Sequence, residues 1–300
     1  MTNRQGQLKC QPMATPMIYL PHRAGLSLTG PDTLVLLERL VTNATNDWDL
    51  GTTRYGALLT PQGKVLSDFL ALRIADGVLL DVSADHIDDL AKRLRMFRLR
   101  SNVEIARLEN LVIMAGIEDT PNDTPSLTGA AYIYQDPRYP GGRVRGFVTM
   151  EQVDQAQSIS DYHADRITNG IPEQGVDFGA AEVFPADINM DVLGGVALKK
   201  GCFVGQEVVS RMHRRGQIRK RTLRFNVDAR SAIETGAELL APAPVGSVSS
   251  YEGDQGLARI RVDRLIKAEA AGAAVTLNET PVTITKPDWL VREQDAMKQT

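Results

Sequence analysis

The order of apolar and polar residues changes its period several times along the first half of the chain. Alternation from Ala24 to Thr29 predicts a half-buried strand. Leucines and a valine then recur every three or four residues over 34–41, which predicts an amphipathic helix opened by Gly30-Pro31-Asp32. Turn residues divide the apolar stretch 55–80 into consecutive strands, and helical spacing returns over 85–98. This mixture predicts an α+β fold.

Strand-like alternation dominates the last part of the chain. It begins at Thr222, and glycines and prolines interrupt it repeatedly between residues 236 and 272. Short strands separated by such turns are typical of a small β-barrel. We therefore predict two interleaved α+β subdomains in residues 1–220, a C-terminal β-barrel in 221–290 and a loose polar tail in 291–300.

Composition and charge narrow the classes of protein. The 300 residues are 43% apolar and carry a net charge of −3, which gives no global attraction to nucleic acid or to a membrane surface. The two cysteines, Cys10 and Cys202, make no disulfide framework, and no apolar run approaches the roughly 18 residues of a membrane span. These features predict a soluble protein of a reducing compartment, the cytoplasm, or the mitochondrial matrix if the source is eukaryotic.

The most informative stretch runs from Lys199 to Glu207. Two glycines bracket Cys202 there, two lysines precede it, and a helix is predicted to start at Gln206. Ammonium groups and a helix N-terminus both favour the thiolate, which is the form of cysteine that attacks and ligates. Because residues i and i+2 share a side in an extended segment, we expect Lys200 rather than Lys199 beside the thiol. The alternative is a cysteine packed as a small buried hydrophobe.

The same region is strongly basic. Nine lysines and arginines lie between Lys199 and Arg224, with one acidic residue, Glu207. Such an excess suits a phosphate backbone, although few aromatic residues are interleaved with the charges. Nucleic-acid binding, for example in RNA modification, is therefore one alternative, and a solvated face or an acidic protein partner is the other.

Several segments resemble one known family. Residues 200–207 read Lys-Gly-Cys-Phe-Val-Gly-Gln-Glu and are similar to the signature of the YgfZ branch of the YgfZ/GcvT family. Residues 184–191 and 166–173 resemble two further motifs of that family, with Asp187 standing where glutamate is usual. The similarity extends from about Leu20 to about Val262, so it covers most of the chain.

The resemblance implies a folate-binding, aminomethyltransferase-like α+β fold with a C-terminal β-barrel. It also implies tetrahydrofolate or a derivative as ligand, and an accessory role in the assembly or repair of iron–sulfur clusters. The partners would be iron–sulfur assembly proteins or client enzymes, and the chain would act as a monomer. Because two cysteines and four scattered histidines cannot supply a complete cluster site, we expect no permanently bound metal.

Individual residues take roles from the resemblance. The signature supplies the functional residues Cys202 and Lys200, with Gly201, Phe203, Gly205, Gln206 and Glu207 around them. Asp68 matches an aspartate placed near the reactive nitrogens of folate, and the alternative for it is an outward-facing strand carboxylate. The expected folate contacts are Asp68, Asn189, Asp191, Arg23 and Ile171, the last two at positions where bacterial members carry tryptophan. We expect one cleft to contain Asp68, Asn189, Asp191 and the motif around Cys202.

The main alternative function is enzymatic, that of a folate-dependent aminomethyltransferase or a related one-carbon transferase. The fold resemblance and Asp68 favour it. The aminomethyltransferase branch, however, lacks the motif around Cys202. The sequence leaves open whether the chain catalyses a reaction.

Overall fold

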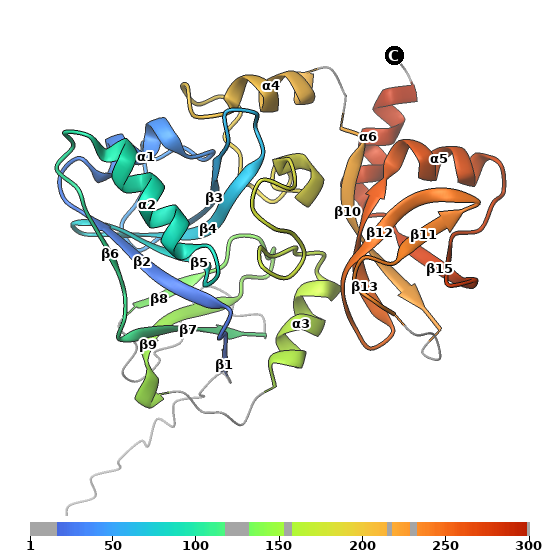
Figure 1. The fold of residues 1–300 in the computed structure, drawn as a ribbon, viewed down its shortest axis with the longest axis horizontal. Coiled ribbons are helices and arrows are strands. Elements are labelled where there is room, and N and C mark those ends of the chain that lie inside the picture. Colours follow the sequence, from blue (N-terminus) through green and yellow to red (C-terminus); the bar gives the residue numbers. More distant parts are fainter. Residues whose placement is uncertain (1–16, 118–131, 153–157, 215–217, 229–232, 299–300) are drawn as a thin grey trace, which may run out of the picture.

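The computed structural model describes residues 17–117, 132–152, 158–214, 218–228 and 233–298. Figure 1 shows two parts side by side, which we name the N-terminal body (the described residues up to 214) and the C-terminal barrel (those from 218 onward). Helix α3, Ile159–Thr168, lies next to the barrel. Its Arg166 donates a hydrogen bond to Ser250 of the barrel, so the two parts are in direct contact.

The first sheet of the N-terminal body has five antiparallel strands in the order β3-β4-β5-β2-β6. The strands are β2 Arg23–Thr29, β3 Thr53–Leu59, β4 Val65–Ile74, β5 Gly77–Ser83 and β6 Glu104–Arg107. Two helices cover one face of this sheet, α1 Thr33–Leu40 and α2 Ile87–Arg98. The strands and helices predicted for this segment are therefore confirmed, because each has a strong local period.

A second sheet packs under the other face of the first. Its four antiparallel strands are, in spatial order, β1 Met17–Tyr19, β7 Leu111–Gly116, β9 Val144–Thr149 and β8 Tyr132–Gln135. Neighbouring side chains of β4 alternate between the two cores: Leu70 and Leu72 pack toward Phe147 of the second sheet, whereas Phe69 packs toward the helices. The first sheet is consequently buried on both faces.

An irregular segment joins α3 to the helix that follows the cysteine motif. It contains a short 3₁₀ helix, η2 Pro185–Ile188, and ends at α4, Gln206–Arg214. Helix α4 lies at an edge of the N-terminal body (Figure 1), and the first barrel strand is the next element after it in the sequence. Within the described ranges, no helix combines the length and the apolar character needed to cross a bilayer.

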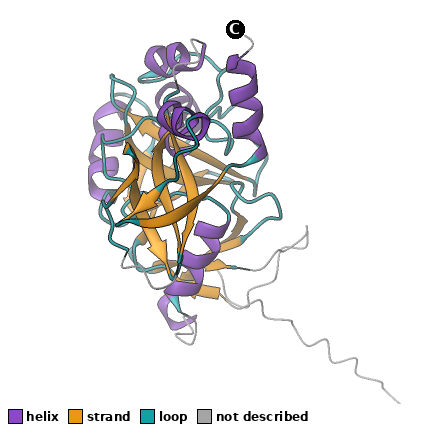
Figure 2. Cartoon of the chain, turned by 90° about the vertical axis from the view of Figure 1, so that its right-hand side faces the viewer, coloured by secondary structure: helices purple, strands orange, loops and turns teal. Residues whose placement is uncertain are grey.

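The C-terminal part is a closed six-stranded barrel, as the sequence predicts. Its strand order is β10-β13-β12-β11-β14-β15, and Figure 2 looks onto this side of the molecule. The strands are β10 Lys220–Val227, β11 Glu238–Ala241, β12 Ala243–Glu252, β13 Gln255–Arg261, β14 Thr276–Leu277 and β15 Thr280–Thr285. Helix α5, Val262–Ala270, continues directly from β13.

The predicted loose tail is wrong for most of its length. Helix α6 runs over Asp288–Lys298, and Leu290 and Gln294 are buried. Glu293 accepts a hydrogen bond of 2.9 Å from Arg221 of β10. A few anchoring contacts to distant residues hold this polar segment in place, and local composition cannot reveal such contacts.

Candidate functional site

The cysteine motif forms an exposed loop that is held tightly on both sides. Cys202 is exposed, so the alternative of a cysteine packed in the core is wrong. The next side chain, Phe203, is buried in the core between the two sheets. Gly205 has φ +80°, and a Cβ there would lie 2.6 Å from the carbonyl oxygen of Thr60. Only glycine fits this position, because the loop presses against the β3–β4 turn with a left-handed backbone.

Lys200 anchors the loop instead of facing the thiol. Its ammonium group donates hydrogen bonds to the carbonyl oxygens of Val41 (2.9 Å) and Asn43 (2.7 Å) and lies 3.6 Å from the carboxylate of Glu38. Burial lowers the pKa of Lys200, and Glu38 offsets only part of this effect. The expectation that Lys200 lies beside Cys202 is therefore corrected: the ammonium group ties the motif to the chain that leaves α1.

The other motif residues lie around the start of α4. The Gln206 side-chain amide donates a weak hydrogen bond of 3.4 Å to the carbonyl oxygen of Lys200, which closes the loop. Gly201 and Glu207 are exposed. The predicted helix is confirmed, with Val209 as its buried apolar contact. The motif thus places the Cys202 thiol at the surface, while Phe203, Gly205 and Lys200 fix its backbone against the rest of the body.

Asp68 lies deep inside the N-terminal body, on β4. Its side chain is 1% exposed, so the alternative of an outward-facing carboxylate is wrong. Tyr55 donates a 2.9 Å hydrogen bond to Oδ2, and the Asp68 amide donates one of 3.0 Å to Gln174. Burial raises the pKa of Asp68, and nearby Arg23 and Arg138 offset only part of that rise. Its second oxygen, Oδ1, is buried without a hydrogen-bond partner.

Arg23 is also buried rather than open to a ligand ring. Its Nε donates to Asp81 Oδ1 and its Nη2 to the Asp81 carbonyl oxygen, both at 2.7 Å. Its Nη1 lies 3.6 Å from Glu173 and makes no hydrogen bond. The guanidinium group therefore belongs to a set of buried charges at the centre of the body.

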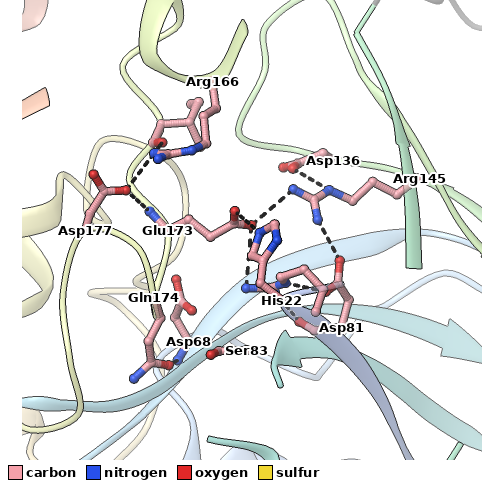
Figure 3. A network of polar contacts seen from close by, with 12 residues as sticks. His22, Asp68, Asp81, Ser83, Asp136, Arg145, Arg166, Glu173, Gln174 and Asp177 are labelled. Carbon is pink, nitrogen blue, oxygen red and sulfur yellow. Dashed lines mark hydrogen bonds and ion pairs between the residues drawn. The ribbon is translucent and has the colours of Figure 1, made fainter. Parts of the chain in front are cut away.

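This set, which we call the buried polar network, was not predicted from the sequence (Figure 3). Its residues are His22, Arg23, Tyr55, Asp68, Asp81, Tyr134, Asp136, Arg138, Arg145, Tyr162, Arg166, Glu173 and Asp177. Arg145 donates to Asp81 (2.9 Å), Asp136 (3.1 Å) and Tyr162 (2.7 Å). The network joins strands of both sheets to the segment after α3.

Three acids of the network, Glu173, Asp136 and Asp68, have pKa values shifted in opposite directions. Burial alone would raise the pKa of Glu173, but Arg23, His22 and Arg145 hold it well below its ordinary range. Burial is likewise outweighed at Asp136, where Arg138 and Arg145 lower the pKa. Asp68 is the exception, with a raised pKa. Among these acids it is the one best suited to hold a proton or to accept a hydrogen bond from a ligand.

A sequence signal for part of the network existed. Asp81 and Arg145 stand inside otherwise apolar strand segments, where a charge is disfavoured unless it has a partner. Arg166 and Glu173 belong to one of the motifs that carry the family resemblance. Their pairing could not be read from the sequence, because the partners are far apart in the chain.

The remaining predicted residues do not share the surroundings of Asp68. Asn189 donates to the Thr222 carbonyl oxygen (2.6 Å), and the Asp191 carboxylate accepts two bonds from Arg221 (2.6 and 3.0 Å). Ile171 is buried in the protein interior. Across the described ranges, no hydrogen bond or ion pair links Asp68, the Asn189–Asp191 segment and Cys202. The three groups therefore have separate hydrogen-bond partners, and the single cleft that would contain them stays a prediction.

Tetrahydrofolate is the ligand that the resemblance implies, and the groups near Asp68 fit its polar edge. Asp68 Oδ1 is a buried acceptor and Arg23 Nη1 a buried donor; neither makes a hydrogen bond, although Nη1 lies 3.6 Å from Glu173. Such groups suit the nitrogen-rich edge of a pterin. Asp68, Arg23 and Ile171 are all buried. A ring could therefore enter only after neighbouring side chains move.

Within the part of the chain that the structure describes, no group of three or more histidine, cysteine or acidic side chains is arranged to hold a metal ion.

The fold and the barrel define the class of this protein. The chain superimposes on the crystal structure of glycine cleavage system aminomethyltransferase T from Bartonella henselae with a TM-score of 0.68, over 92% of this chain and 86% of the other, at 15% identity. Residues 219–292 match the family model described as CAF17, C-terminal beta-barrel domain. The predicted aminomethyltransferase-like fold with a C-terminal barrel is confirmed.

The names of similar curated proteins describe a narrower class than the fold does. The chain is 33% identical to the iron-sulfur cluster assembly factor IBA57 homolog, mitochondrial, of Mycosarcoma maydis, over 67% of this chain and 55% of that protein. It is 27% identical to the iron-sulfur cluster assembly factor IBA57, mitochondrial, of Homo sapiens, over 90% of this chain and 84% of that protein. The matches to the first four relatives, all fungal, cover 55–64% of those proteins.

Proposed function

We propose that this chain is an accessory factor for the assembly or repair of iron–sulfur clusters, and that Cys202 is the side chain through which it acts. The observation that carries the proposal is the exposed thiol on a loop fixed by Phe203, Gly205 and Lys200. The curated relatives support it, because the names of those relatives describe iron–sulfur cluster assembly factors.

The chemistry of a cluster limits what one chain can do with it. A cluster is ordinarily held by four cysteine thiolates, whereas this chain has two cysteines in all. Cys202 can therefore supply one ligand, and the others must come from an assembly protein or a client enzyme. A thiol loses its proton when it ligates iron, and an exposed side chain lets that proton pass to water. We infer that the chain works in a reducing compartment, the cytoplasm or the mitochondrial matrix, and as a monomer until its partner docks.

Loss of the gene tests the proposal against its enzymatic alternative. In a strain without this chain, we expect several iron–sulfur enzymes to lose activity while glycine cleavage stays intact. The measurement is a set of enzyme assays in extracts, with an iron-free enzyme as control. Normal iron–sulfur activities together with a defect in glycine cleavage would favour the one-carbon transferase.

We also propose folate binding at Asp68, favoured by the two unpartnered polar atoms Asp68 Oδ1 and Arg23 Nη1. When bound, a tetrahydrofolate could carry one-carbon units, and Asp68 would accept a hydrogen bond from it. Titration calorimetry with tetrahydrofolate should show saturable binding that Asp68→Asn weakens about tenfold, the loss typical of one charge-assisted hydrogen bond. Absence of heat at millimolar ligand would contradict folate binding by this chain.

A further inference from the structure

A basic groove lies where α4 approaches the barrel. It has a volume of about 440 Å³ and is lined by Lys64, Glu182, Phe184, Asp187, Met212, Arg219, Lys220, Ser247, Arg259 and Arg261. These residues come from the β3–β4 turn, the segment around η2, the end of α4 and the barrel strands β10, β12 and β13. We call this feature the basic groove. Residues of both the N-terminal body and the C-terminal barrel line it, and one of them, Met212, belongs to α4, the helix that follows Cys202.

The groove carries more positive charge than its own acids neutralise. Arg259 pairs with Glu182 at 2.6 Å, and Arg261 pairs with Asp263 outside the groove at 2.8 Å. Lys64 donates to the backbone carbonyl oxygen of Glu182 at 2.6 Å, so its charge has no carboxylate of its own.

Two further cations and one buried acid complete the groove. Arg219 and Lys220 are exposed and make no hydrogen bond or ion pair with the side chains that the structure describes. The acid on the floor, Asp187, is buried, and burial raises its pKa although Lys220, Arg259 and Lys64 offset part of that rise. Even with Asp187 counted as a counter-charge, the five cations of the groove outnumber its two acids. Lys64, Arg219 and Lys220 are thus left for an external anion.

We propose that the basic groove docks an acidic segment of the protein that exchanges the cluster with Cys202. This inference rests on the proposed function and names the chemistry of its partner. Helix α4 has nine residues, about 13 Å at 1.5 Å per residue, and separates the thiol loop from the groove. A standard interface of about 800 Å² per partner, a patch about 30 Å across, spans both. Exposed Arg211 and Arg214 on α4 extend the positive surface between them.

The occupant is an acidic protein rather than a nucleic acid because the basic groove also contains carboxylates. Glu182 lines it with a side chain 48% exposed, and Glu207 lines the neighbouring hollow along α4. A phosphate backbone is repelled by both, whereas a protein surface can place a donor or a base opposite them. The groove contains one aromatic ring, Phe184, and the Lys64 ammonium group lies over one of its faces at 4.8 Å, so the groove offers little surface on which successive bases could stack.

The binding test uses a fluorescein-labelled peptide of nine glutamates and three lysines, whose ammonium groups can lie opposite Glu182 and Glu207, and a single-stranded RNA of twelve nucleotides. Both are measured by anisotropy at low and high salt. The groove variant is Lys64→Glu with Lys220→Glu. The matched control, Lys92→Glu with Arg93→Glu on the exposed face of α2, changes the net charge equally. We expect the peptide to bind the full chain more tightly than the RNA, and its affinity to fall about tenfold or more in the groove variant but less than about twofold in the control.

Three results would overturn the inference: an unchanged peptide affinity in the groove variant, an equal loss in the control, or tighter binding of the RNA. If the double charge reversal unfolds the chain, Lys64→Gln with Lys220→Gln gives the same comparison with a smaller loss. The melting curve of each variant identifies that case.

Rescue of the deletion strain separates this inference from the proposed function. We expect the groove variant to restore iron–sulfur enzyme activity poorly and the control variant to restore it fully. A groove variant that loses peptide binding yet rescues fully overturns docking and leaves the role of Cys202 standing. If Cys202→Ser rescues fully while the groove variant does not, the docking surface stands and the proposed role of the thiol fails.

Discussion

Replacing Arg145 with methionine is expected to lower the free energy of unfolding by about 3–5 kcal/mol, the cost of leaving buried charges without their partner. Arg145 donates to Asp81, Asp136 and Tyr162, and lies 3.5 Å from Glu173. All these groups are fully buried, so water cannot take the place of the guanidinium group. Methionine retains much of the volume but none of the donors. Urea denaturation of the two proteins measures the difference.

The matched control is the same substitution at the surface. Arg107 is 41% exposed, and its ion pairs are to Asp88 (3.4 Å) and Glu109 (3.8 Å), both largely exposed. Arg107→Met should therefore cost less than about 1 kcal/mol, because water screens such pairs. Equal stabilities of the Arg145 and Arg107 variants would mean that the buried polar network does not hold the two sheets together.

Replacing Cys202 with serine is expected to lower the iron–sulfur activity that the chain supports by about tenfold or more, since the loss of even an outer-shell partner of a metal ligand commonly costs about 10- to 100-fold. Serine keeps the size and polarity of the side chain and removes the soft sulfur ligand. The fold should not change, because Cys202 is exposed and the loop is held by its neighbours. Melting curves of the two proteins should therefore coincide.

Labelling of the native thiol checks the same prediction without any activity assay. Cys10 is first replaced by serine, so that one thiol remains. Iodoacetamide should then modify the folded protein as completely as the denatured protein. A thiol that reacts only after denaturant is added would contradict the exposed position of Cys202, and with it the proposed role.

The sequence predicted best what local spacing determines. The helix over 34–41, the β-meander that follows it and the barrel all have a clear period or regular turn residues, and each is present. Gly205 belongs to the motif that the sequence singles out, and its contact with Thr60 shows why a glycine is needed there.

The sequence could not predict what distant residues decide together. Lys200 was expected beside Cys202, whereas its ammonium group reaches Val41 and Asn43, more than 150 residues earlier. Asp68 looked compatible with a solvated strand until Tyr55 and Arg23 proved to surround it. Helix α6 looked like a polar tail, because its anchor to Arg221 lies far away in the chain. In each case the partner is set by the fold and not by the neighbouring residues.

The most direct test of the central claim is iron–sulfur enzyme activity in a deletion strain that carries either the natural chain or the Cys202→Ser chain at equal protein level. The account predicts that the natural chain restores the activities and that the serine variant does not, although both accumulate and melt alike. Full restoration by Cys202→Ser would contradict the claim that this chain acts through its exposed thiol.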